Sequence, residues 1–175
     1  MGRSTLASRD WRTAETLWPV TERYGHWKVA VSADGTRSLV DRNTASAVMS
    51  NGERERFSYR EYFERASGRV LCLGLGMGWI TAPLLHCPRV TSLDVVELDP
   101  ELVEWVGPKL NRLDQRGVLR LHNADAWKWS AEEQSWDSIF LNVWHKHGLA
   151  GLHELEQRWS PHLAPGGWLG HWLCE

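Results

Sequence analysis

Closely spaced glycines between an apolar segment and an expected helix are the feature of the sequence best suited to bind a ligand. Gly74, Gly76 and Gly78 follow the apolar residues 69–73 and precede a helical pattern. A glycine has no Cβ, so the backbone can approach a ligand closely, and the N–H groups at a helix start point toward that ligand. Trp79 stands where a dinucleotide-binding GxGxxG loop has its third glycine, which argues against a bound pyrophosphate. Tight packing of a strand against a helix is the alternative explanation of these glycines.

Polar residues stand at the ends of further apolar segments. Glu97 follows the glycine loop by about 20 residues, and its carboxylate could accept hydrogen bonds from both hydroxyls of a ribose. Asp125 could accept a hydrogen bond from an adenine amino group. Asn142 could orient a nucleophile, although an amide is no general base. Taken alone, Glu97 could equally be an exposed acid beside the helix-capping Asp99, and Asp125 could have only a structural role in the turn that contains it.

Histidines and cysteines are the other candidates for chemistry. His145 and His147 lie just past Asn142, where an imidazole could act as a general base, or could be solvated or structural. The three Cys are far apart and show neither a disulfide pattern nor zinc-ligand spacing. We therefore predict no metal site.

Apolar strand-like segments alternate with helical patterns after residue 67, which is typical of βαβ units and a mainly parallel sheet. The sequence predicts strands over residues 69–73, 90–98, 118–121, 136–143 and 168–173. Helices are predicted over residues 79–86, from Asp99-Pro100 onward, and over about 149–163. Gly107-Pro108 is expected to interrupt the second of these helices, and Pro165-Gly166-Gly167 to turn the chain into the last strand.

The part of the chain before residue 68 has a different pattern. Trp27, Val29 and Val31 alternate with less apolar residues, and the Asp34-Gly35 turn signal predicts a β-hairpin. A further extended segment is expected over residues 45–49. A single helix is predicted over residues 54–66, with Phe57, Tyr62 and Phe63 on its inner face. We therefore expect two units, a β-rich cap with a linking helix over residues 1–67 and a ligand-binding α/β domain over residues 68–175.

The overall composition excludes several classes of function. The chain has 175 residues, and 20 Lys+Arg against 22 Asp+Glu give a formal net charge of −2. This balance supplies no electrostatic reason to expect a nucleic-acid or membrane partner. The sequence has no apolar stretch of the roughly 20 residues that span a bilayer and no secretory signal, so we expect a soluble, cytoplasmic protein. The 12 Trp are expected mainly to fill the core, while Trp127, Trp129 and Trp144 could line a crevice.

Several motifs, in their order along the chain, resemble those of class I S-adenosylmethionine-dependent methyltransferases. They are LGLGMG (73–78), VVELDP (95–100), NADA (123–126), WDSIFLN (136–142) and APGGW (164–168). The resemblance implies a Rossmann-like sheet that binds S-adenosylmethionine. Its loop glycines Gly74, Gly76 and Gly78 would hold the methionine and ribose part, Glu97 the ribose, and Asp125 with Ala126 the adenine.

The residues before the glycine loop resemble the spermidine-synthase-like branch of that superfamily. Tyr59 and Glu61 match its helix motif, whereas Arg60 stands where a His is usual. Aminopropyltransferases have an acid at the end of the fourth strand, and Asn142 occupies that place here. We therefore expect methyl transfer, with Asn142 and His145 near the reacting centre and Tyr59 closing over the site.

The expected acceptor is a small molecule such as an amine. An aminopropyltransferase-like enzyme using decarboxylated S-adenosylmethionine, or a non-catalytic protein that binds the adenosyl ligand, are the alternatives. The family's sheet usually ends in an antiparallel hairpin, which this sequence lacks. A homo-oligomer that covers the edge of the fifth strand is expected for that reason.

Overall fold

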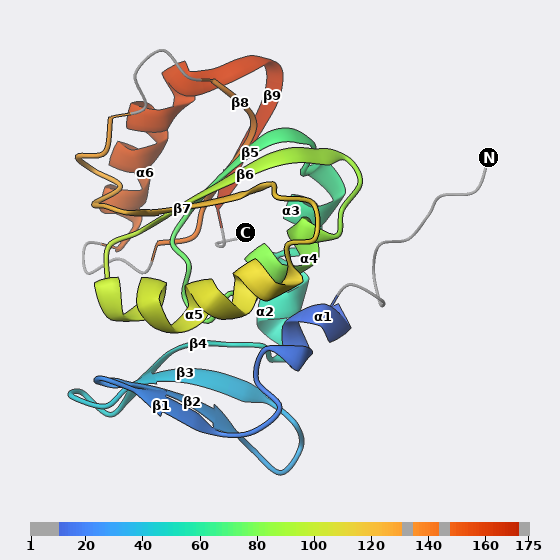
Figure 1. Ribbon diagram of the computed structural model, residues 1–175. Helices are drawn as coiled ribbons and strands as arrows, with labels where there is room; N and C mark the ends of the chain where they lie inside the picture. Colours follow the sequence, from blue (N-terminus) through green and yellow to red (C-terminus); the bar gives the residue numbers. More distant parts are fainter. Residues whose placement is uncertain (1–10, 131–134, 144–147, 172–175) are drawn as a thin grey trace.

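The computed structural model describes residues 11–130, 135–143 and 148–171, and these residues form two sheets (Figure 1). A 5-stranded parallel sheet has the order β7-β6-β5-β8-β9, and a 4-stranded antiparallel sheet has the order β1-β2-β3-β4. The parallel strands are β5 (Gly68–Leu73), β6 (Val90–Glu97), β7 (Leu119–Asn123), β8 (Trp136–Leu141) and β9 (Leu163–His171). The predicted α/β sheet and the predicted N-terminal β-hairpin are both confirmed.

Both faces of the parallel sheet are buried, which explains why its strands are almost wholly apolar. In β5, Val70 and Cys72 belong to one core cluster and Leu71 and Leu73 to the other. Successive side chains of a strand point to opposite faces, so an apolar run needs a covering layer on each side. Each fully buried aliphatic side chain contributes about 1.5–3 kcal/mol.

Helices supply these covering layers (Figure 1). They are α4 (Thr81–Leu85), α5 (Pro100–Leu113) and α6 (Gly148–Trp159), the last followed by a 3₁₀ turn, η1 (Ser160–His162). Helices α4 and α5 contact β6 and α6 contacts β8. The side chains of Leu152, Leu155 and Trp159 form the buried face of α6.

Helix α5 begins as predicted but does not end as predicted. Asp99 caps it, because its Oδ1 accepts a hydrogen bond from Glu101 N at 2.8 Å. The expected interruption at Gly107-Pro108 was wrong, since the helix continues through Pro108 to Leu113. Pro108 is exposed, as is Glu104 one turn earlier, so water can solvate the carbonyl that the proline leaves unpaired. Burial on the inner face holds the helix together across this point.

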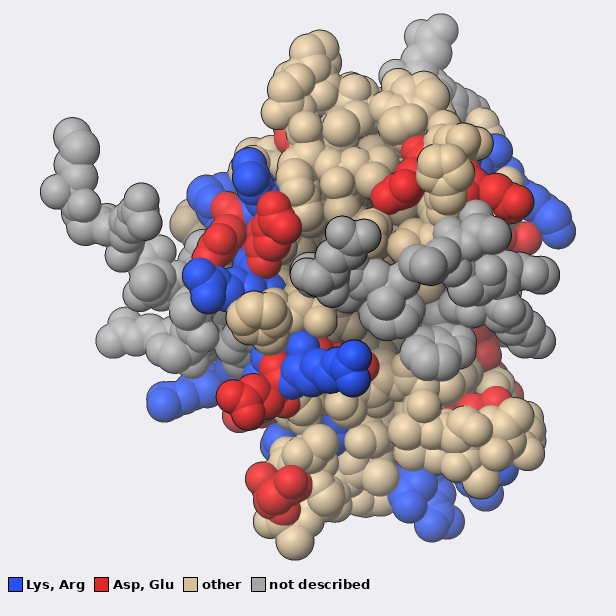
Figure 2. Space-filling model, turned by 180° about the vertical axis from the view of Figure 1, so that it is seen from behind, with Lys and Arg blue, Asp and Glu red and all other residues tan. Residues whose placement is uncertain are grey.

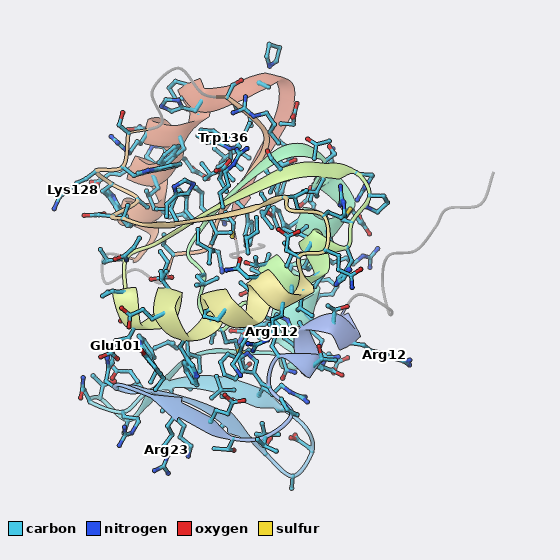
Figure 3. All side chains as sticks on the ribbon, in the orientation of Figure 1. Arg12, Arg23, Glu101, Arg112, Lys128 and Trp136 are labelled. Atoms are coloured by element: carbon cyan, nitrogen blue, oxygen red, sulfur yellow. The ribbon has the colours of Figure 1, made fainter. Side chains whose placement is uncertain are left out.

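A cluster of Trp side chains fills the space between α6 and the parallel sheet, where Figure 3 labels Trp136. The ring of Trp129 lies 6.0 Å from that of Trp136 and 5.7 Å from that of Trp159. Trp136 Nε1 donates to Asp94 Oδ2 at 3.0 Å. Core filling therefore accounts for these Trp residues, and the expectation that Trp129 lines the crevice was wrong.

The N-terminal unit contains more elements than the sequence predicts. Its strands are β1 (Glu22–Tyr24), β2 (Trp27–Val31), β3 (Arg37–Asp41) and β4 (Ser46–Ser50), and its helices are α1 (Trp11–Thr16), α2 (Glu53–Ser58) and α3 (Arg60–Arg65). The single helix predicted over residues 54–66 was wrong, because the chain breaks at Tyr59 into α2 and α3. This break turns Phe57 outward, 69% exposed, against the prediction, while Tyr62 is buried and stacks on Phe140 at 4.1 Å.

The last strand starts earlier than predicted. Residues 165–167, expected to form a turn before the strand, lie inside β9. The pairing shifts there, from Trp136 opposite Leu163 to Ser138 opposite Trp168, and Gly166 has φ +77°. The turn signal thus produces an irregularity within an edge strand. Among the helices of the described residues, none is long and apolar enough to cross a membrane.

Candidate active site

The strand order brings four of the predicted site residues into one row. Asp125 follows β7, Glu97 ends β6, Gly74 follows β5 and Asn142 follows β8, and these strands are neighbours in that order. The carboxyl ends of parallel strands meet at one edge of the sheet, where open α/β folds bind their ligands. All four residues line a cavity of about 320 Å³. The sequence-based expectation of a shared crevice is therefore met.

The opposite wall of this cavity comes from the four-stranded sheet (Figure 1). Trp27 of β2, Leu39 of β3 and Met49 of β4 line it. Met49 also reaches the glycine loop, because Met77 N donates to Met49 Sδ at 3.4 Å. The cap thus closes the cavity that the parallel sheet leaves open.

The glycine loop requires its glycines for different reasons. Gly76 has φ +53°, and a Cβ there would lie 2.3 Å from Met49 Sδ. Gly78 has φ +75° and lies against α5, where a Cβ would be 3.0 Å from Val106 Cγ1. The packing explanation therefore holds for Gly78, whereas Gly74 and Gly76 line the cavity. A role of Gly78 in ligand binding stays a prediction.

Glu97 links the glycine loop to the end of β6. Its Oε2 accepts hydrogen bonds from Leu75 N at 2.8 Å and Gly76 N at 3.5 Å, and its Oε1 accepts one from Asp99 N at 2.9 Å. Burial raises the pKa of Glu97, and these three N–H groups partly offset the shift. A carboxylate has about four lone-pair sites, so Glu97 keeps acceptor capacity for a ligand.

Asp125 and Ala126 both line the cavity while stabilising their own turn. Asp125 Oδ1 accepts a hydrogen bond from Trp127 N at 2.9 Å, and Asp125 Oδ2 lies 3.4 Å from the exposed ammonium of Lys128, which is labelled in Figure 3. The carbonyl of Ala126 accepts a hydrogen bond from Trp159 Nε1 at 3.2 Å. The turn role and a ligand-binding role of Asp125 are thus compatible. Trp127 lines the cavity, as expected.

Asn142 meets Tyr59 at the other end of the row. Tyr59 Oη donates to Asn142 Oδ1 at 3.5 Å, and the Tyr59 ring packs edge-on against Phe140. Burial raises the pKa of Tyr59 well above its ordinary value, with a smaller contribution from the negative charge of Glu55. The hydroxyl is therefore a neutral donor near pH 7. The predicted catalytic residue His145 lies outside the described residues, as do His147 and Trp144.

Sequence reasoning missed several residues of the cavity, among them Glu55, Trp27 and Asp99. The helical spacing of Glu55 and Tyr59, four residues apart, was a signal that could have placed both on one face. Asp99 was recognised only as a helix cap, but its Oδ2 also accepts a hydrogen bond from Trp27 Nε1 at 3.0 Å. The parts of the chain that the structure describes contain no cluster of His, Cys, Asp and Glu able to hold a metal ion.

Comparison with known proteins finds one short similarity in sequence. No family model matches the chain. It is 41% identical over 54 residues to the ribosomal RNA small subunit methyltransferase A of Nitrosococcus oceani. This match covers 31% of the chain and only 19% of the length of that relative.

Solved structures are similar over a larger share of the chain. The N-methyltransferase NodS from Bradyrhizobium japonicum has a TM-score of 0.54 and 18% identity, covering 69% of this chain and 68% of NodS. The glycopeptide N-methyltransferase MtfA, solved in complex with S-adenosyl-L-methionine, has a TM-score of 0.52 and 20% identity, covering 67% of this chain and 54% of MtfA. Together with the strand order, these likenesses show that the described chain has the Rossmann-like fold of class I S-adenosylmethionine-dependent methyltransferases.

Proposed function

We propose that this protein binds S-adenosylmethionine in the cavity and transfers its methyl group to a small-molecule acceptor, with an amine as the expected class. The observation that carries the proposal is the row of Asp125, Glu97, Gly74 and Asn142 along one edge of a methyltransferase-like sheet. The cavity volume of about 320 Å³ lies within the range of small-molecule sites.

The residues present suit the cofactor. Asp125 and Ala126 would hold the adenine and Glu97 the ribose, while the backbone at Gly74 and Gly76 would lie beside the methionine part. Neither position has room for a Cβ, which would meet Asn142 O or Met49 Sδ, so the bare backbone of these glycines lines the cavity. S-adenosylmethionine supplies an electrophilic methyl group on a sulfonium. The protein then contributes mainly by aligning the acceptor with that methyl group and excluding water.

The cap favours a small acceptor over a macromolecule. Residues from three strands of the four-stranded sheet cover the cavity, and its lining is mainly apolar. On the face shown in Figure 2, Lys and Arg side chains lie beside Asp and Glu side chains, without the single-sign surface that a polyanion would favour. An RNA acceptor is the second candidate, and the short similarity to a ribosomal RNA methyltransferase is the observation in its favour.

The spermidine-synthase-like branch is also part of the proposal, supported by the cap and by Tyr59 reaching the cavity. Within that branch, Asn142 at the end of β8 favours methyl transfer over aminopropyl transfer, because an amide cannot take a proton from an attacking amine. We further propose that residues 1–67 and 68–175 act as cap and cofactor-binding domain, and that a second copy of the chain covers β9, an edge strand of the described sheet. The cytoplasmic location stays a prediction.

Calorimetric titration tests the cofactor. S-adenosylmethionine and S-adenosylhomocysteine should bind with micromolar dissociation constants, more tightly than decarboxylated S-adenosylmethionine or NAD. The variant E97A should lose this binding, because it removes both the ribose acceptor and the contact that holds Leu75 N and Gly76 N. The variant E104A, at an exposed position of α5, is the matched control. Tighter binding of the decarboxylated form would favour aminopropyl transfer, and no binding of any ligand would contradict the proposal.

A further inference from the structure

The cavity contains a carboxyl group that the proposed cofactor site does not use. Glu55 comes from α2 in the N-terminal unit, whereas Glu97, Asp99 and Asp125 follow strands of the parallel sheet. The carboxylates of those three acids already accept hydrogen bonds from backbone N–H groups near them. Glu55 therefore differs from these three acids in origin, although its carboxylate also accepts a hydrogen bond from a backbone N–H, that of Ser50.

Glu55 lies at the Asn142 end of the cavity. It precedes Tyr59 by one helical turn, and its carbonyl accepts a hydrogen bond from Tyr59 N at 3.1 Å. Tyr59 Oη in turn donates to Asn142 Oδ1. Both residues line the cavity, and the negative charge of Glu55 contributes to the raised pKa of Tyr59. Asp125, the expected adenine partner, follows β7, two strands from the β8 end that carries Asn142.

One oxygen of Glu55 is held in place. Ser50 N donates to Glu55 Oε2 at 2.5 Å, which fixes the side chain against the end of β4. The Ser50 side chain also acts on this carboxylate and lowers its pKa, and no other described residue donates a hydrogen bond to it. The apolar residues Val48, Met49 and Val143 line the same cavity. A half-buried carboxylate among apolar side chains attracts a cation more strongly than one in water.

We propose that Glu55 binds the protonated amino group of an amine acceptor and takes one proton from it, an inference that rests on the proposed function. Glu55 Oε1 receives the proton from the alkylammonium group, which leaves a neutral amine with a free electron pair. This pair forms the new N–C bond to the methyl group as the C–S bond of S-adenosylmethionine breaks and its electrons stay on sulfur. The products are a methylated ammonium and a neutral thioether, and the proton on Glu55 passes to water.

Two features of the chain support this assignment. Asn142 cannot accept the proton, so an acid from elsewhere is needed for an amine substrate that is charged at neutral pH. Burial raises the pKa of Glu55, and the backbone N–H and the side chain of Ser50 only partly offset that shift, so its carboxylate is a stronger base than an exposed glutamate. The N-terminal unit would thus supply, through Glu55, the proton-accepting carboxylate that is missing at the end of β8.

The test compares E55Q with E53Q, because Glu53 is an exposed acid on the same helix. The panel consists of butylamine, benzylamine and 1,4-diaminobutane, with butanol and benzyl alcohol as uncharged counterparts. Wild-type protein and E53Q should bind and methylate at least one amine and neither alcohol. E55Q should lose on the order of 100-fold in turnover, a typical contribution of a general base, while it binds S-adenosylmethionine with unchanged affinity.

A binding measurement separates substrate recognition from turnover. In protein saturated with S-adenosylhomocysteine, the dissociation constant of the amine should rise about tenfold in E55Q and recover in part in E55D, which keeps the charge. Equal amine binding and turnover in E55Q and wild type would overturn the assignment of Glu55, as would a wild-type protein that binds S-adenosylmethionine but accepts no amine. Failure of the wild type to bind S-adenosylmethionine at all would instead remove the proposed function on which the assignment rests.

Discussion

Gly74 and Asn142 meet backbone to backbone where β5 and β8 end. A Cβ on Gly74 would lie 2.1 Å from the Asn142 carbonyl oxygen. The backbone N–H of Asn142 donates to Leu73 O at 2.8 Å, and Gly74 N donates to Val96 O at 2.8 Å. The first glycine of the loop therefore sets the position of the polar residue beside it in the row.

The variant G74A should be strongly destabilised and should lose cofactor binding. Gly74 has φ +99°, a conformation that costs a residue with a Cβ roughly 1–2 kcal/mol, and the clash with a backbone oxygen adds about 1–3 kcal/mol. Urea denaturation should therefore show a loss of at least about 2 kcal/mol in the free energy of unfolding.

The matched control for this prediction is G35A. Gly35 also has a positive φ, +83°, but a Cβ there would have no heavy atom within 4 Å. G35A should lose about 1–2 kcal/mol in the free energy of unfolding, the cost of placing a residue with a Cβ at positive φ, and should keep its cofactor affinity. If G74A and G35A lost equal free energies of unfolding, the close approach of Gly74 to Asn142 would add nothing to the destabilisation.

The variant N142A should depress turnover much more than it weakens S-adenosylmethionine binding. Asn142 lies at the end of the cavity away from the expected adenine site, and its amide contacts Tyr59 Oη at 3.5 Å. Steady-state kinetics should show the loss in kcat, while calorimetry should show a dissociation constant within about threefold of wild type. Y59F tests the same contact from the other side, and this long hydrogen bond should contribute less than about 1 kcal/mol to stability. Unchanged turnover in N142A would exclude Asn142 from the mechanism.

The stability of E55Q relative to wild type should depend on pH. Burial raises the pKa of Glu55 in the folded protein above its unfolded value, so the folded state favours the protonated form. The stability from this shift is fully present below the unfolded pKa and is lost as the pH rises through the folded pKa. Denaturation should therefore show that the free energy of unfolding of E55Q, relative to that of wild type, is higher at pH 8 than at pH 4.

This pH comparison needs a control for charge. E53Q removes one negative charge at an exposed position of α2 without touching the cavity. The other acids that line the cavity, Glu97, Asp99 and Asp125, are present in wild type and in both variants, so their titration cancels in the comparison. A difference between E55Q and wild type that stayed constant from pH 4 to pH 8 would argue against a desolvated Glu55.

The parallel sheet and its site row could be predicted because their signals are local. An apolar run such as 69–73 needs cover on both faces, and a polar residue that ends such a run must lie at the carboxyl edge. Gly74, Glu97, Asp125 and Asn142 were found in this way, and all four line the cavity. Apolar runs and the residues that follow them were sufficient to predict these four positions.

The elements that sequence reasoning missed depend on tertiary contacts. The break at Tyr59 is favoured by packing of Tyr59 and Tyr62 on Phe140, which lies far along the chain. Helix α5 tolerates Pro108 because buried neighbours hold it, which no local signal indicates.

Contacts between the cap and the start of α5 lead to the last prediction, that E101A should loosen the cap. Figure 3 labels Glu101 at the end of α5 that faces the four-stranded sheet. Glu101 Oε2 accepts hydrogen bonds from His26 N at 2.9 Å and from the His26 ring at 2.8 Å when Nδ1 carries the proton. The adjoining Trp27 lines the cavity and donates to Asp99, so the same contact positions one wall of the site.

Removal of the Glu101 carboxylate should cost about 1–2 kcal/mol of stability, because it leaves a part-buried backbone N–H unpaired. It should also weaken S-adenosylmethionine binding, since the cap wall is then held less firmly over the cavity. E104A is the matched control, because Glu104 lies on the same helix and accepts a hydrogen bond from the exposed Tyr24 Oη at 2.9 Å, not from a part-buried backbone N–H. Denaturation and calorimetry should show a small effect for E104A and a larger, linked loss of stability and affinity for E101A. If E101A lost stability but bound the cofactor as wild type does, the cap would be a structural addition that takes no part in holding the ligand.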